Sequence, residues 1–251
     1  MAKDIIITAQ DLDALSRLAQ AEATSIAAAL VAQGIAQDAA YKAAYASIVD
    51  TVINRVASNS SSIFGSTIID VINKPVQFEP VTSANGNWQN LPEANQAVYN
   101  AVRDHIIDRT KNSAGSTVST ATHYLNPTVT GSTYDVDNNG INDGWENWGE
   151  KMANRTAIGS AFNAEGDLNS NVNAHVFGNA NRLRPDAYTL SYDENGDGQI
   201  SETEKSGTFE QLLPRRKPNT DNVSPQELND LNPEDWHRLG IRLFLFGKVF
   251  S

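Results

Sequence analysis

Apolar residues recur every three or four positions through the first hundred residues of the chain, a spacing that predicts amphipathic helices. In the first helix, Thr8 with Asp11 three residues later forms the pattern of a capping box, so the helix is expected to begin there. Its apolar positions are Leu12, Leu15, Leu18 and Ala19. The other predicted helices cover residues 39–56, residues 67–73 (capped by Ser66 and stopped by Pro75) and the stretch from Pro92, in the first turn, to Ile106.

The second half of the chain has a different composition. From about Ser113, the residues of turns and short irregular strands dominate: Asn, Gly, Asp, Ser and Thr. Residues 188–192 look extended, and a last helix is predicted from Asn232 to Phe246, where its apolar face would dock on the core. We therefore expect a mainly α (α+β) fold. A helical core over residues 1–127 would carry a loop-rich extension, residues 128–251, in one compact unit.

Charge and composition narrow the classes of function. The chain of 251 residues has a net charge of −11, which argues against nucleic-acid and anionic-membrane partners. It has no cysteine, so disulfides, Cys-ligated zinc and a thiol nucleophile are excluded. No apolar run reaches the ~18 residues of a membrane span, so membrane insertion is not expected. The first residues do not form a secretory signal, so another system would have to deliver the protein if it acts outside the cytoplasm.

An acidic loop at residues 193–204 fits the twelve-residue EF-hand frame at every diagnostic position. Gly198 permits the sharp bend at position six, and Ile200 is the usual apolar residue at position eight. The predicted Ca²⁺ ligands are Asp193, Asn195, Asp197, the Gln199 carbonyl, Ser201 and Glu204. The alternative is a solvated turn rich in Asn and Asp.

A second loop, residues 135–146, has the same frame with one departure, since Asn142 stands where an apolar residue is usual. Its predicted ligands are Asp135, Asp137, Asn139, the Ile141 carbonyl, Asp143 and Glu146. Neither loop follows a convincing helix. We therefore expect isolated structural clamps that use Ca²⁺ as cofactor, and not the paired helices of a calcium sensor.

Glu22 lies on the apolar stripe of the first predicted helix, among small residues such as Ala19 and Ala23. Burial raises the pKa of a carboxyl group, and a carboxyl protonated near neutral pH is what a general acid for glycosidic cleavage requires. Two interpretations remain open from the pattern. Glu22 is either such an acid or a helix-face glutamate that reaches solvent past its small neighbours.

Four segments in order extend this interpretation: LSRLAQAEA at 15–23, IVDTVINRV at 48–56, IIDVINKPVQF at 68–78 and ATHYLNP at 121–127. Together they resemble the SleB-type cell-wall hydrolases, the spore-cortex-lytic enzymes. The resemblance implies a small lysozyme-like helical fold that cleaves peptidoglycan glycan strands, with the calcium loops as additions to it. The chain departs from the family pattern after Glu22, where Thr24-Ser25-Ile26 replaces a frequent Arg-Gly-Glu and residues 25–42 precede the second helix.

The resemblance also implies roles for single residues. It places the catalytic glutamate at Glu22, the lining of the glycan cleft at Gln77 and Phe78, and the opposite wall at His123, Tyr124 and Asn126. Arg55 would form a structural salt bridge behind the site. Glu79 is the nearby candidate for a second catalytic carboxylate.

We thus expect a muramidase or lytic transglycosylase that acts on the MurNAc–GlcNAc β-1,4 bond. Its partners would be peptidoglycan glycan strands and an immunity or delivery protein. It would act in the periplasm or at the cell wall after delivery by another system, as an antibacterial effector or phage lysis enzyme. The alternative is a non-catalytic, calcium-dependent module that binds the cell wall or has a structural role.

Overall fold

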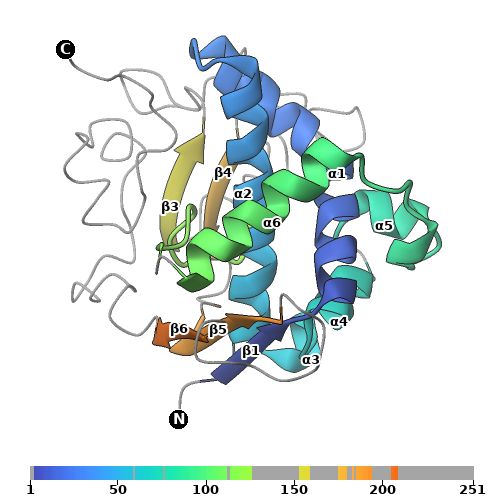
Figure 1. The fold of residues 1–251 in the computed structure, drawn as a ribbon, viewed down its shortest axis with the longest axis vertical. Coiled ribbons are helices and arrows are strands. Elements are labelled where there is room, and N and C mark those ends of the chain that lie inside the picture. The colour runs from blue at the N-terminus through green and yellow to red at the C-terminus, as the bar shows by residue number, and fades with distance from the viewer. Residues whose placement is uncertain are drawn as a thin grey trace, which may run out of the picture.

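Helices make up most of the described chain, and two small sheets flank them (Figure 1). The computed structural model describes residues 3–58, 60–75, 77–111, 114–125, 153–158, 175–179, 183, 185–193 and 205–208. The helices are α1 (Ala9–Ala32), α2 (Gln37–Ala57), α3 (Ser61–Phe64), α4 (Ile68–Asn73), α5 (Glu79–Ser83), the 3₁₀ helix η1 (Trp88–Asn90) and α6 (Gln96–Lys111). The strands are β1 (Lys3–Ile7), β2 (His123–Leu125), β3 (Ala153–Ile158), β4 (His175–Asn179), β5 (Tyr188–Tyr192) and β6 (Lys205–Thr208). The expectation of a mainly α fold with a small β part is confirmed.

Side chains at the helix ends explain where the helices begin. The capping box of Thr8 and Asp11 is present at the start of α1, as predicted. The cap of α4 is Thr67 and not Ser66, because the Thr67 hydroxyl accepts the Asp70 N–H at 3.1 Å. The predicted start of α6 at Pro92 is wrong. The Asn95 side chain accepts the Val98 N–H at 3.1 Å, and this local cap starts the helix four residues later.

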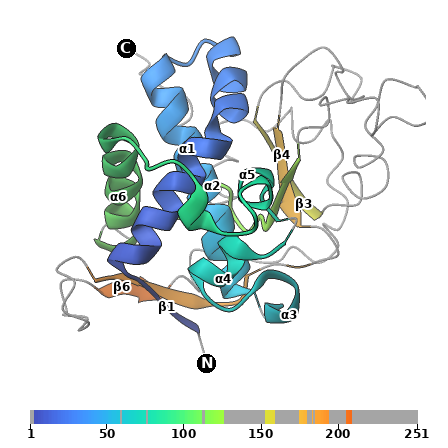
Figure 2. The same ribbon diagram turned by 90° about the vertical axis from the view of Figure 1, so that its right-hand side faces the viewer.

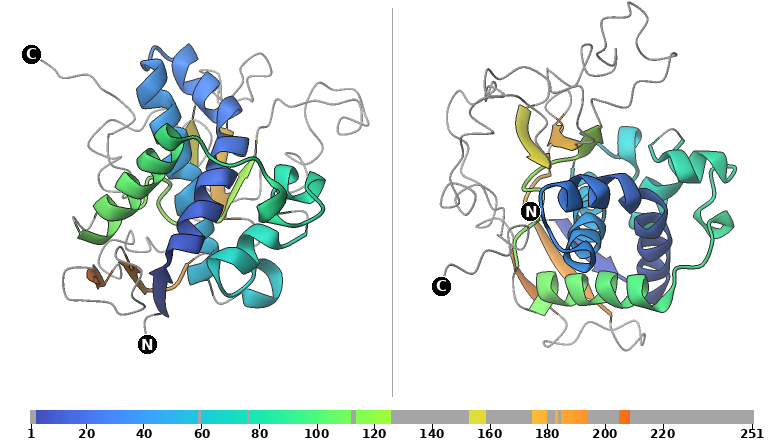
Figure 3. Two further views of the ribbon diagram at one scale, coloured as in Figure 1. Left: turned by 45° about the vertical axis from the view of Figure 1, so that its right-hand side comes forward. Right: turned by 90° about the horizontal axis from the view of Figure 1, so that it is seen from above.

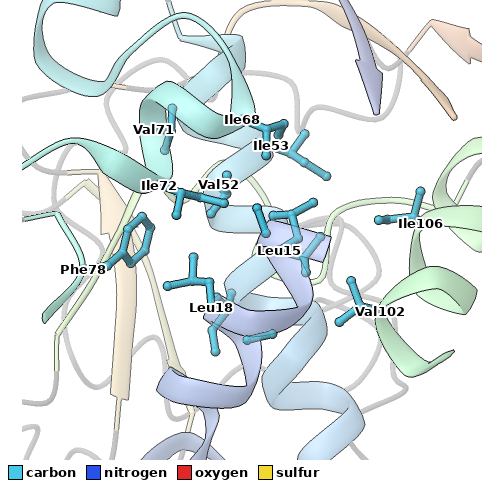
Figure 4. Close-up of a cluster of buried hydrophobic side chains, with 14 of the residues drawn as sticks. Leu15, Leu18, Val52, Ile53, Ile68, Val71, Ile72, Phe78, Val102 and Ile106 are labelled. Carbon is cyan, nitrogen blue, oxygen red and sulfur yellow. The ribbon is translucent and has the colours of Figure 1, made fainter. Parts of the chain in front are cut away.

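The core lies where α1, α2 and α6 pack against one another and where α4 packs on α1 and α2 (Figure 3). The short helices α4 and α5 lie beside α1, and α3 follows α2 on the far side of α4 (Figure 2). Figure 4 shows the hydrophobic cluster at the centre of this packing. Its labelled aliphatic side chains come from α1, α2, α4 and α6, and Phe78 lies at one side. Its labelled members are Leu15, Leu18, Val52, Ile53, Ile68, Val71, Ile72, Phe78, Val102 and Ile106.

The two sheets connect distant parts of the sequence. In the first, with the order β1-β5-β6, β1 pairs in parallel with β5, from Lys3 opposite Tyr188 to Ile7 opposite Tyr192. In the second, β4 lies between β2 and β3 and is antiparallel to both. The predicted extended segment 188–192 is confirmed, and the predicted helix at 232–246 lies outside the described residues. No helix in the described ranges combines the length and hydropathy of a membrane span.

A buried cluster of charged and polar groups ties α2 and α6 to these sheets. Arg109 donates to the Asp50 carboxylate and, at 2.6 Å, to the Tyr188 hydroxyl, and both Asp50 and Arg109 are fully buried. Thr117 donates its N–H and its hydroxyl to the same carboxylate, at 2.6 and 2.8 Å. Burial alone would raise the pKa of Asp50, but Arg109, the neighbouring His105 and Thr117 lower it to about 2. Asp50 is therefore a permanent anion at neutral pH.

We expect Arg109→Met to destabilise the fold by about 3–5 kcal/mol, because it leaves the Asp50 carboxylate buried without its cation. Urea denaturation monitored by circular dichroism measures this change. The matched control is Arg103→Met on the same helix, where the arginine is partly exposed and pairs with Asp104; it should change the free energy of unfolding by no more than ~0.5 kcal/mol. Equal effects of the two substitutions would contradict the role given to the Asp50–Arg109 pair.

Candidate active site

Glu22 occupies the middle of α1, where its small neighbours leave room for a carboxyl group. Ala19 and Ala23 beside it are fully buried, whereas Glu22 itself is half-buried. The apolar stripe predicted for this helix is real, since Leu15 and Leu18 have no exposed surface. The carboxyl group therefore sits at the edge of the core, protected on the side of the helices and reachable on the other.

Tyr124, on β2, forms a hydrogen bond with the Glu22 carboxyl group. Its ring packs on Phe177 of β4, with ring centroids 5.4 Å apart. Burial and the neighbouring Glu22 raise the pKa of Tyr124 well above its ordinary value. The phenol thus keeps its proton over the whole physiological range and acts as the donor in this bond.

Arg55 of α2 lies behind this pair and is buried, with an exposed fraction of 4%. Its guanidinium carbon is 5.5 Å from the ring centre of Phe64 and 4.7 Å from that of Phe78. Its Nε donates to the main-chain carbonyl of Thr122 at 2.6 Å. Burial lowers the pKa of Arg55 to about 10, while Tyr124 and Glu22 act to raise it. The side chain therefore still carries its charge at neutral pH.

These neighbours act on the Glu22 carboxyl in opposite directions. Burial is the largest influence and raises its pKa, and the negative charge of Glu79 adds to this. The hydrogen bond from Tyr124 and the charge of Arg55 lower the pKa, and the net shift is upward. Glu22 is thus an acid that stays protonated to higher pH than a free glutamate, but whose carboxylate form has a donor and a cation beside it.

Glu79, the other predicted carboxylate, is exposed at the start of α5 and accepts a hydrogen bond of 2.7 Å from the Ser83 hydroxyl. Its effect on the pKa of Glu22 places it within electrostatic range of that residue. The structure therefore brings both candidate carboxylates to one region. One is half-buried and the other faces solvent.

The remaining predicted residues have different environments. Gln77 is half-buried, while Phe78 has an exposed fraction of only 1% and forms part of the core against which Arg55 packs. Phe78 thus supports the site from behind and is not a surface of the cleft. His123 packs its ring edge-on to Phe64, and its Nδ1 lies 2.9 Å from the Thr122 hydroxyl oxygen. Burial and Arg55 lower the pKa of His123 to about 3, so it is neutral at physiological pH.

Three polar side chains of α2 form hydrogen bonds with the segment before β2, and these bonds explain why β2 lies beside Glu22. Asp50 binds Thr117, and Asn54, one turn later, donates to the carbonyls of Ser119 and Ala121 at 3.0 and 2.8 Å. Arg55 binds the carbonyl of Thr122. Successive main-chain groups of residues 117–122 are thereby fixed along α2, and the next residues bring Tyr124 to Glu22.

Residues 41–161 match the model of the cell wall hydrolase family. This segment, just under half of the chain, is similar to the cell wall hydrolase family. The SleB-type resemblance predicted from the sequence is thereby confirmed. No curated protein and no solved structure matches the chain.

The match contains Arg55, Glu79 and Tyr124 but begins after Glu22. Glu22 lies outside the matched segment, but α1 packs along α2 and brings its carboxyl group to Tyr124 inside that segment. Arg55 was predicted to form a salt bridge, but its hydrogen bond goes to a carbonyl and its faces to aromatic rings. The sequence signal for that role is the aromatic pair Phe64 and Phe78, which lie before and after α4.

Asp193 is the one predicted calcium ligand among the described residues. It is buried directly after β5, and its N–H donates to the Ile7 carbonyl of β1 at 3.0 Å. The other predicted ligands of both loops and the predicted substrate residue Asn126 lie outside the described residues. Within the part of the chain that the structure describes, no three His, Asp or Glu side chains form a group that could hold a metal ion.

The bond between Tyr124 and Glu22 can be tested directly. We expect Tyr124→Phe to raise the pKa of Glu22, because the hydroxyl group stabilises the carboxylate form. The pKa is read from the pH titration of the ¹³C-labelled glutamate carboxyl signals, with Glu22→Gln to assign the signal of residue 22. Tyr41→Phe, on the far end of α2, is the control and should leave the titration unchanged. An unchanged pKa in Tyr124→Phe would mean that the hydroxyl does not donate to Glu22.

Proposed function

We propose that this protein cleaves the glycan strands of peptidoglycan, with Glu22 as the general acid. The observation that carries the proposal is the raised pKa of a half-buried carboxyl group bonded to Tyr124, in a chain that is similar to the cell wall hydrolase family. Cleavage of a glycosidic bond needs an acid that is protonated near neutral pH and becomes a carboxylate when it donates. The upward shift of the Glu22 pKa is in the direction that this role needs, and Tyr124 and Arg55 lie beside its carboxylate form.

In the proposed reaction, Glu22 donates its proton to the oxygen between MurNAc and GlcNAc. The bond from the MurNAc C1 to that oxygen breaks, the electron pair stays with the leaving oxygen, and an oxocarbenium-like centre develops at C1. In a hydrolase, water then attacks C1 and gives its proton to a carboxylate. In a lytic transglycosylase, the MurNAc 6-hydroxyl group attacks instead and gives the anhydro sugar. Glu79 is the candidate for a second carboxylate.

Glu22→Gln should abolish glycan cleavage and leave the fold intact, because the amide keeps the shape of the side chain and cannot donate as an acid. Mass spectrometry of digested sacculi measures the products and distinguishes anhydro from reducing MurNAc ends. Glu93→Gln is the matched control, since Glu93 is a highly exposed glutamate that packs near α1.

If the folded Glu22→Gln protein released normal muropeptides, Glu22 would not be the acid, and Glu79→Gln would be the next variant to measure. If the unaltered protein bound sacculi without cleaving them, the alternative of a non-catalytic wall-binding module would replace the proposal. An antibacterial or phage lysis role is part of the proposal, and a neighbouring immunity or holin gene would distinguish the two.

We also propose that residues 193–204 bind Ca²⁺ and stabilise the fold. The support is the complete ligand frame in the sequence and the position of Asp193, whose backbone is held against β1. A cation that binds only the folded state stabilises it by mass action. An ion at this loop would therefore strengthen the attachment of β5 to β1.

Chelation with EGTA should lower the melting temperature, and Asp193→Ala combined with Asp197→Ala should remove most of this effect. The matched variant in the other loop is Asp135→Ala combined with Asp137→Ala. Calorimetric titration of metal-free protein with Ca²⁺ counts the sites. No heat and an unchanged melting curve would reduce both loops to solvated turns, and a single site would be assigned to residues 193–204.

A further inference from the structure

The guanidinium group of Arg55 is buried, and no anion is bonded to it among the residues that the structure describes. Its Nε binds the Thr122 carbonyl, and its faces pack on Phe64 and Phe78. Its Nη1 is also buried and has no hydrogen-bond partner among the described residues. A buried cation that lacks a bonded anion costs several kcal/mol, so a neutral residue would give a more stable core.

The groups around Arg55 indicate when this charge is useful. On β2, His123 and Tyr124 face it, and both are neutral at physiological pH. On α1, Glu22 interacts electrostatically with Arg55, and Glu79 of α5 acts on Glu22 in turn. Of the groups that interact directly with Arg55, Glu22 is the one that changes from neutral to negative when an acid donates its proton.

We infer that Arg55 is a positioning residue for the acid step: it stabilises the Glu22 carboxylate left after proton donation and, through Thr122, holds Tyr124 against it. This inference rests on the proposed role of Glu22 as the acid. When the glycosidic C1–O bond breaks, its electron pair goes to the leaving oxygen, the Glu22 proton joins that oxygen, and the carboxylate keeps the negative charge. A cation and a donor fixed in advance lower the energy of that charge without reorganisation. The attacking hydroxyl group or water later returns a proton.

The variant that tests the inference is Arg55→Gln, which keeps a planar donor group and removes the charge. The pKa of Glu22, followed by ¹³C NMR, should rise by about one unit. The pH at which kcat/KM falls on the alkaline side should move up by the same amount. The value of kcat should fall about tenfold or more, because the carboxylate product of proton donation is less stable. Lys42→Gln removes the same charge from an exposed position on the same helix and should change none of these quantities.

A purely structural role for Arg55 predicts a different result. A folded Arg55→Gln protein with reduced activity and an unchanged Glu22 pKa would overturn the inference. Glu79→Gln gives the opposite sign in the same titration, since loss of its negative charge should lower the Glu22 pKa.

A second measurement observes Arg55 itself in the unaltered protein and applies if Arg55→Gln fails to fold. The ¹⁵N–¹H signal of the Arg55 Nε, assigned by its absence in Arg55→Lys, should move with pH at the midpoint of the Glu22 titration. In Glu22→Gln that movement should disappear. If the chemical shift of this signal does not change over the Glu22 titration, the inference is overturned even if Glu22→Gln is inactive. A signal that follows it while Glu22→Gln stays active would support the coupling and refute the proposed function instead.

Discussion

The Asp50 carboxylate is shared by parts of the chain that are far apart in sequence. It receives Arg109 from α6 and Thr117 from the segment after it, and Arg109 in turn binds Tyr188 of β5. Because the carboxylate and the guanidinium are fully buried, neither can exchange its partner for water. The relative positions of α2, α6 and β5 are therefore set by one charged cluster in addition to the apolar core.

The active site depends on this arrangement through the segment 117–122. Hydrogen bonds from Asp50, Asn54 and Arg55 hold the beginning, middle and end of this segment. The segment therefore runs along α2. The strand that follows then places Tyr124 beside Glu22 on the neighbouring helix. The chemistry of a few polar residues on one helix thus connects the stability of the core with the geometry of the acid.

Local patterns were enough to predict some features. The start of α1 follows from Thr8 and Asp11, three residues apart, and the position of Glu22 at the edge of the core follows from the period of the helix. The early start given to α6 failed because Pro92 suits a first turn, whereas the Asn95 side chain provides the actual cap. Strand β1 could not be predicted, since three isoleucines are too short a signal and their partner lies 185 positions further on.

The environment of Glu22 was only partly predictable, because some of its neighbours are also far away in sequence. Its apolar neighbours within α1 are visible in the sequence, but the donor and the cation that act on it come from Tyr124 and Arg55, which reach it through the tertiary fold. The pairing of Asp50 with Arg109 was missed because the residues are 59 positions apart. Family resemblance supplied Tyr124 as a site residue, and the hydrogen bond to Glu22 came from the structure.

The parallel pairing of β1 with β5 has a consequence for the order of folding. Residues 3–7 are made on the ribosome well before their partner strand, which ends at Tyr192. Parallel pairing across so long a separation is slow to form, since the loop must close before the contacts can stabilise it. Until β5 is made, the backbone edge of β1 that pairs with it stays without this partner. The nascent chain therefore exposes an unpaired strand edge until β5 is made. A chain that stops short of β5 would keep this edge, which is able to pair with other chains.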